Sequence, residues 1–86
     1  MKSLYLVKWR DARGGSNIGW RSVSECIQAE TATVWSCGFI LHEDDQRLVI
    51  CPHVVLDSDN NVTDGDAEIS IPRDWVVSKL ELFANE

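Results

Sequence analysis

The chain has 86 residues, 44% of them hydrophobic, which suits one small globular domain and argues against a disordered segment. Its net charge of −6, and the lack of any apolar run of about eighteen residues, exclude a broad basic surface for duplex nucleic acid and a transmembrane helix. The charge is uneven, because residues 1–21 hold five basic residues and one acidic residue, whereas residues 22–86 hold three basic and thirteen acidic residues. We therefore expect a single domain, residues 1–86, that attracts an anion at one end.

The cysteines and the N-terminal residues indicate the cellular compartment. Cys26, Cys37 and Cys51 are odd in number and widely spaced, so they do not suggest a disulfide framework. Charge returns at Lys8, too early for the apolar core of a signal peptide. We expect reduced and mostly buried thiols in a cytoplasmic protein. We also expect a homo-oligomer, because self-association is a common way for a short chain to bury more surface.

The first predicted element is a strand over residues 4–10, where apolar and basic residues alternate and Trp9 lies on the apolar face. Glycines within residues 14–19 then end regular structure. The spacing from Ser22 to Glu25 is that of a capping box, which predicts a short helical turn after it.

The middle of the chain predicts a β-hairpin, because two apolar runs, residues 31–42 and 47–56, flank a polar turn. Gly38 lies inside the first run, where it suggests a β-bulge or a strong bend. Residues 57–66 are polar and predict a loop.

The last part of the chain predicts a short strand over residues 67–71, a helical turn at Pro72-Arg73-Asp74 and a final strand over residues 76–83. The chain is thus mostly β, with five short strands and one helical turn before the last strand. This order matches a small five-stranded barrel of the SH3-like type, and an open sheet with one helix is the alternative.

Four segments together resemble a pattern of small phage and prophage proteins. They are Val7-Lys8-Trp9-Arg10-Asp11-Ala12, Gly19-Trp20, Ser36-Cys37-Gly38-Phe39-Ile40-Leu41-His42-Glu43-Asp44 and Ile71-Pro72-Arg73-Asp74-Trp75-Val76. The resemblance spans nearly the whole chain and implies a phage-encoded accessory protein with an SH3-like β-barrel. It implies no mechanism, and residues 13–17 match the pattern least.

The main candidate site is a basic, glycine-rich loop. Backbone N–H groups of such a turn and arginine side chains can bind an anion together, and an indole can stack on a nucleobase. The candidate residues are Trp9, Arg10, Arg13, Gly14, Gly15, Ser16, Asn17, Trp20 and Arg21. The loop lacks the phosphate-loop motif. A plain surface loop, a pocket for a small nucleotide-like anion and a protein interface therefore all stay open.

A second loop has the spacing of calcium ligands. Asp57, Asp59 and Asn61 occupy the first, third and fifth positions of such a loop, and Glu68 falls at the twelfth. Val62 stands where the calcium loop requires glycine, and both flanks read as strands. We therefore interpret the segment as a surface loop without a bound cation.

The remaining metal-ligating residues give a weaker pattern. Cys26, Cys37, Cys51 and His53 could surround zinc, but none lies in a Cys-x-x-Cys pair. His42 and His53 have no recognisable nucleophile beside them, so a structural pairing with acidic side chains is the better interpretation. We expect no metal, no cofactor and no enzymatic activity.

Three hypotheses about function follow. The first is a non-enzymatic phage accessory protein that antagonises host defence by binding a small nucleotide-like signal or a host protein. The second is a structural or regulatory phage protein that acts through protein contacts, with Trp20 and Trp75 as anchors, or through DNA mimicry by the acidic residues of 57–68. The third is a metal-dependent hydrolase that uses the carboxylates of the same acidic segment.

Overall fold

The computed structural model describes residues 2–14 and 19–85, and strands make up most of them. In chain order the elements are β1 (Lys2–Asp11), α1 (Val23–Ile27), β2 (Ala32–Glu43), β3 (Arg47–Cys51), β4 (His53–Leu56), β5 (Val62–Asp66), β6 (Ile69–Pro72), the 3₁₀ turn η1 (Arg73–Trp75) and β7 (Val76–Asn85). The predicted mostly β class is confirmed. No helix in these two ranges is long and apolar enough to cross a membrane.

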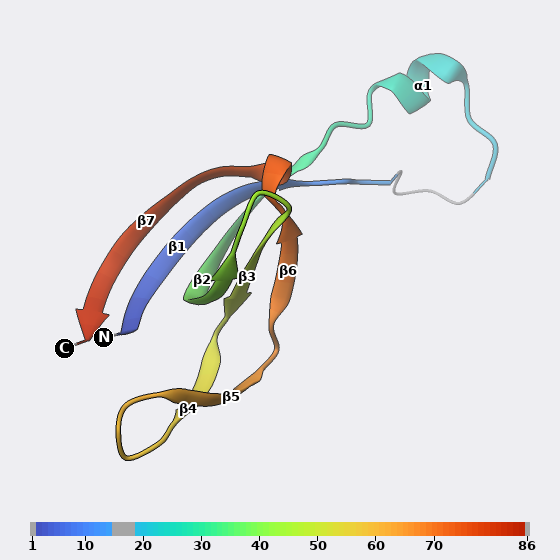
Figure 1. The fold of residues 1–86 in the computed structure, drawn as a ribbon. Coiled ribbons are helices and arrows are strands. Elements are labelled where there is room, and N and C mark those ends of the chain that lie inside the picture. The colour runs from blue at the N-terminus through green and yellow to red at the C-terminus, as the bar shows by residue number, and fades with distance from the viewer. Residues whose placement is uncertain (1, 15–18, 86) are drawn as a thin grey trace.

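Five strands form one curved antiparallel sheet in the order β6-β3-β2-β1-β7 (Figure 1). Strands β4 and β5 pair with each other as a separate two-stranded unit. The five-stranded sheet is open, because β6 and β7 are its two edges and do not pair with each other in the described part of the chain. The SH3-like barrel expected from the order of elements is therefore not confirmed.

Proline explains where the structure departs from the predicted hairpin. The apolar run over residues 47–56 forms two strands, because Pro52 has no N–H to donate to the β-ladder. β3 ends before Pro52, and β4 begins after it with a different partner. That partner is β5, which lies within residues 57–66. The prediction of a loop over residues 57–66 is therefore wrong for residues 62–66, which form β5 by pairing with the backbone of β4.

Two local predictions are confirmed and one is displaced. The Ser22 hydroxyl oxygen caps α1 by accepting a hydrogen bond from the Glu25 backbone N–H at 3.2 Å. A helical turn, η1, follows Pro72 as predicted. The sequence predicts a β-bulge or a strong bend at Gly38; the bulge lies instead at Leu41, where the register between β2 and β3 shifts.

The hydrophobic core lies on the inner, concave side of the curved sheet, where β1 faces β3 and β6. Its buried cluster consists of Val7, Trp9, Leu48, Ile50 and Ile71. The indole N–H of Trp9 donates a hydrogen bond to the Ser36 hydroxyl at 3.0 Å, so its one polar atom is satisfied. The alternation seen in the first strand thus correctly identified Trp9 as facing the core.

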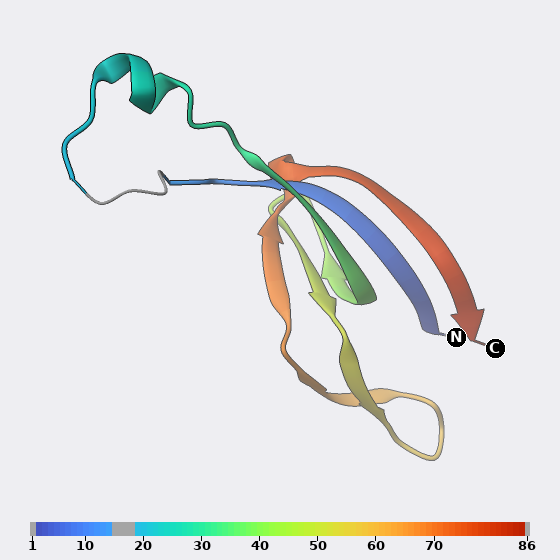
Figure 2. The same ribbon diagram turned by 180° about the vertical axis from the view of Figure 1, so that it is seen from behind.

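The connection between β1 and β2 projects from the sheet as an arm (Figures 1 and 2). We define the arm as residues 12–14 and 19–31, the described part of this connection, which includes α1. The projection fits the elongated shape of the molecule, whose principal extents are 58 × 22 × 21 Å. No residue of α1 is buried, so the arm presents its side chains to solvent.

Candidate functional site

The structure divides the predicted basic loop into a core residue and surface residues. Gly15, Ser16 and Asn17 lie outside the described residues. Trp9 is only 8% exposed and packs in the core, so it is not available to a ligand in this structure. The remaining five are Arg10 on β1 and Arg13, Gly14, Trp20 and Arg21 on the arm.

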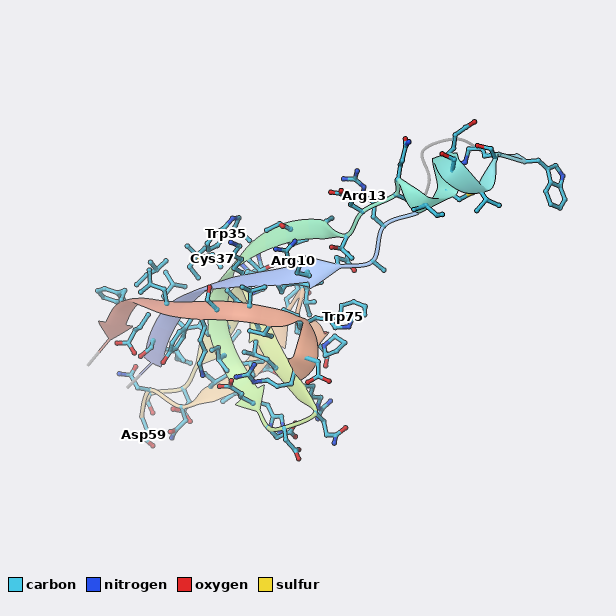
Figure 3. All side chains as sticks on the ribbon, turned by 90° about the horizontal axis from the view of Figure 1, so that it is seen from above. Arg10, Arg13, Trp35, Cys37, Asp59 and Trp75 are labelled. Carbon is cyan, nitrogen blue, oxygen red and sulfur yellow. The ribbon has the colours of Figure 1, made fainter. Side chains whose placement is uncertain are left out.

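Four of these five residues are exposed, and Arg21 is half-buried. Arg10 and Arg13 are both exposed, the first on the sheet and the second where the arm begins (Figure 3). Trp20 is fully exposed. Val23 and Ile27, both on α1, are each about three-quarters exposed, at 74% and 75%. The arm therefore combines arginine side chains, an indole and two aliphatic side chains, and this combination is enriched at protein interfaces.

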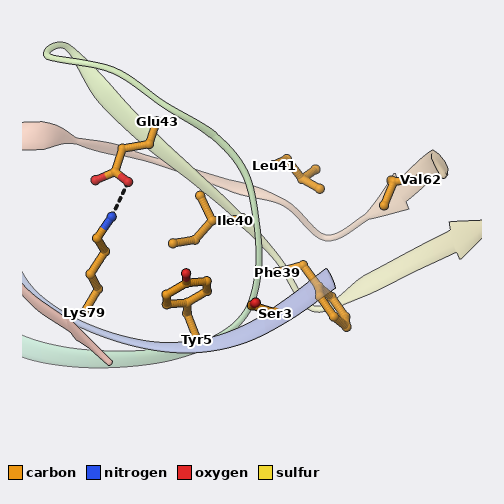
Figure 4. A pocket seen from close by; sticks show the side chains of 8 residues that line it. All are labelled: Ser3, Tyr5, Phe39, Ile40, Leu41, Glu43, Val62 and Lys79. Carbon is orange, nitrogen blue, oxygen red and sulfur yellow. Dashed lines mark hydrogen bonds and ion pairs between the residues drawn. The ribbon is translucent and has the colours of Figure 1, made fainter. Parts of the chain in front are cut away.

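A pocket of about 510 Å³ lies between strands β1, β2, β5 and β7 (Figure 4). It is lined by Ser3, Tyr5, Phe39, Ile40, Leu41, Glu43, Val62 and Lys79. Its volume falls within the range of small-molecule sites. Sequence reasoning missed this pocket because its residues come from β1, β2, β5 and β7, and no local motif joins these strands.

The charged groups of the pocket already have partners. Glu43 forms ion pairs with Lys79 and with the guanidinium Nε of Arg73, the latter at 3.2 Å. The Tyr5 hydroxyl donates a hydrogen bond to the Glu81 carboxylate at 3.1 Å. No arginine is among the described residues that line this pocket. The pocket therefore lacks the guanidinium groups that the predicted nucleotide-binding site requires.

The calcium-like spacing forms a hairpin turn between β4 and β5. The Asp57 carboxylate accepts hydrogen bonds from the backbone N–H groups of Asp59, at 2.8 Å, and Asn61, at 3.0 Å. Asn60 adopts the left-handed conformation that such a turn needs, with φ of 65°. Among the described residues, no three His, Cys, Asp or Glu side chains are grouped so that they could hold a metal ion.

The cysteines differ from the prediction that most thiols are buried. Cys26 on the arm and Cys37 on β2 are exposed, and only Cys51 is buried. The Cys51 thiol lies 3.0 Å from the His53 carbonyl oxygen, to which it donates a hydrogen bond. Cys37 is exposed because it points to the convex side of the sheet, opposite the core.

A histidine–aspartate pair closes the turn between β2 and β3. His42 Nε2 lies 2.7 Å from the Asp44 carboxylate, and both side chains are exposed. The hydrogen bond from His42, with further hydrogen bonds from the backbone N–H groups of Gln46 and Arg47, lowers the pKa of Asp44 from 3.8 to about 2. The pair has the structural role that we expected for His42, at the end of a hairpin.

Comparisons with protein-family models, curated proteins and solved structures find no match to this chain. The function therefore has to be inferred from the arm and the pocket themselves. The arm carries exposed apolar side chains as well as arginines. In the pocket, by contrast, Glu43 and Lys79 already form ion pairs within the protein.

Proposed function

We propose that this protein is a non-enzymatic binding protein that docks on a partner protein through its arm. The observation that carries the proposal is the full exposure of Trp20 on the same arm as the exposed aliphatic residues Val23 and Ile27. Burial of one large aliphatic or aromatic side chain contributes about 1.5–3 kcal/mol. Tryptophan and arginine are also the residues most enriched among those that dominate binding energy. The arm thus concentrates the binding potential of an interface on a short segment.

The composition of the arm indicates what kind of partner fits. Arg13 and Arg21 flank Trp20 in the sequence, so the matching surface has an apolar pocket for the indole and an acidic rim for the guanidinium groups. The resemblance to phage accessory proteins supports a host protein as this partner and antagonism of host defence as the outcome. The same geometry also suits a structural or regulatory phage protein that acts through contacts with another protein.

A retention experiment with host lysate tests the proposal. We expect immobilised wild-type protein to retain a specific host protein, and Trp20→Ala to lose it. Trp20→Phe should keep part of the binding, because it preserves an aromatic anchor. Val55→Ala removes an exposed apolar side chain from β4, outside the arm, and serves as the control that retains the partner. Equal retention by wild type and Trp20→Ala would refute docking through the arm.

Capture of a nucleotide-like anion is the competing function, and it gives a different result. In that case cyclic or ADP-ribose-type nucleotides should raise the melting temperature of the wild type. Arg13→Ala should abolish this rise while leaving the melting temperature of the free protein nearly unchanged, because Arg13 is exposed. These two results together would show that the arm binds a small anionic ligand and would refute the proposed protein partner.

A further inference from the structure

Strand β1 carries large apolar residues on both faces. Val7 and Trp9 point into the core. Leu4 and Leu6 alternate with them along the strand, so they point to the opposite, convex side of the sheet. A strand that is apolar on both faces is typical of a sheet that is covered on both sides. In this chain the second side is not covered by any described element.

The two neighbours of β1 continue this apolar surface. Residues directly opposite each other in paired strands share a face. Leu6 lies opposite Cys37 on β2 and Leu80 on β7, and Leu4 lies opposite Phe39 on β2 and Phe83 on β7. We call this surface the outer face, and it consists of Leu4, Leu6, Trp35, Cys37, Phe39, Leu80 and Phe83. Figure 3 shows Trp35 and Cys37 together on one side of β2.

The outer face has the extent of the apolar centre of an interface. Trp35 is 55% exposed, and Phe83 is 60% exposed. Three strands about 4.8 Å apart, with three rows of side chains about 7 Å apart, span roughly 300 Å² in projection. A standard interface buries about 800 Å² per partner, with an apolar centre and a polar rim. Lys8 lies opposite Trp35 on one side and opposite Ser78 on the other. Lys8 and Ser78 therefore supply polar groups at one border of the outer face.

Charge and stability indicate which molecule covers this surface. Each copy carries a net charge of −6, but the outer face contains no acidic residue, so two copies can approach here with the least repulsion. Only six hydrophobic residues are buried in the core of the described chain. An exposed apolar surface of a few hundred Å² on so small a domain marks a site of association with another protein. The arm of the same copy does not cover the outer face, because it projects away from the sheet (Figure 2). Another copy of the chain is a partner that is present wherever the protein is made.

We propose that the outer face is the surface through which two copies of this chain associate. The two sheets pack face to face about 10 Å apart, as in a β-sandwich, around a two-fold axis. Leu6 and Leu80 then lie near the centre of the interface, while Lys8 stays at its border, with its ammonium 5.5 Å from the centre of the Trp35 ring. The dimer carries two arms.

A charge substitution with a matched control tests this assignment. Leu80 and Val55 are aliphatic, lie on strands and have similar exposure, at 60% and 56%. We expect sedimentation equilibrium to give twice the 9.7 kDa of one chain for wild type and for Val55→Glu. Leu80→Glu should give a single chain, because a buried interface does not tolerate an unpaired carboxylate. A single-chain mass for wild type at concentrations up to about 100 μM would overturn the proposal, because mass action favours the dimer as the concentration rises.

The native cysteines give a second test that needs no substitution. Cys37 lies on the outer face and Cys26 on the arm, and both thiols are exposed in one copy. Between about 1 and 100 μM protein, maleimide labelling of Cys37 should slow about tenfold as dimers form by mass action. Labelling of Cys26 should stay constant. Equal rates for Cys37 at both concentrations would overturn the proposal, whether its thiol stays open or is covered by the arm of its own copy.

Discussion

Replacement of Gly38 by alanine tests the packing of the curved sheet most directly. A Cβ at this position would lie 2.6 Å from the carbonyl oxygen and 2.8 Å from the carbonyl carbon of Cys51, closer than Cβ atoms approach such atoms in proteins. Ile50 Cγ1 lies 3.1 Å from the same position, so both backbone and side-chain atoms of β3 crowd the added Cβ. Strand β3 must therefore move away from β2, which strains the pairing of Phe39 with Cys51.

The cost follows from two opposing effects. Overpacking of a core typically costs 1–3 kcal/mol, and about 3 kcal/mol applies here because the clashing atoms belong to the backbone. Alanine in place of glycine restricts the unfolded chain and returns about 0.4–1 kcal/mol. We expect Gly38→Ala to lose about 2 kcal/mol of unfolding free energy, which lowers the melting temperature by roughly 8–16 °C in a domain of this size.

Differential scanning calorimetry at one fixed protein concentration measures this shift. Gly14→Ala is the matched control, because no atom lies within 4 Å of its Cβ position, and its melting temperature should stay near that of wild type. If Gly38→Ala melts within about 2 °C of the Gly14→Ala variant, the close approach of β3 to β2 is not part of the folded structure.

Three further predictions concern polar contacts. Because the folded-state pKa of Asp44 is lowered to about 2, its contribution to stability is present above its ordinary pKa of 3.8 and is lost as the pH falls towards 2. Urea unfolding between pH 5 and 2 should therefore show a smaller loss of stability for Asp44→Asn than for wild type. Glu43→Gln weakens the exposed ion pairs with Lys79 and Arg73, so chemical unfolding should show a loss of at most about 1 kcal/mol. Trp9→Phe removes the hydrogen bond to the Ser36 hydroxyl and leaves a gap in the core, so the same assay should show a loss of about 1–3 kcal/mol.

Local sequence patterns predicted the elements whose causes are local. The Ser22 capping box produces α1, and the alternation around Trp9 places its indole in the core. The helical turn η1 follows directly after Pro72, which is its N-cap residue. Each of these depends on contacts within a few residues or on the two-residue period of a strand.

The open sheet and the second pairing of strands could not be predicted in the same way. Pro52 indicates where β3 must end, but it does not indicate that β4 then pairs with β5. Whether β6 and β7 meet depends on the accumulated curvature of five strands, which no local pattern records. The pocket could not be predicted for the same reason, because its lining residues come from four strands and meet only in the folded sheet.

The outer face did leave a signal in the sequence. Leu4 and Leu6 interrupt the polar side of the alternation in β1, so the first half of this strand is apolar on both faces. A strand of a small domain with one covered face would carry polar residues there. Only the fold assigns Trp35 to the outer face and Trp20 to the arm.

The arm and the outer face make a joint prediction about binding. A dimer with two arms binds a two-fold symmetric partner through both, and the second contact is intramolecular, so the affinity exceeds that of one arm by about 10²–10⁴. Leu80→Glu should therefore weaken binding to such a partner although every arm residue is intact, whereas Trp20→Ala should weaken each contact itself. Calorimetric titration of an identified partner separates these effects. A partner that binds Leu80→Glu as tightly as wild type is held by one arm at a time.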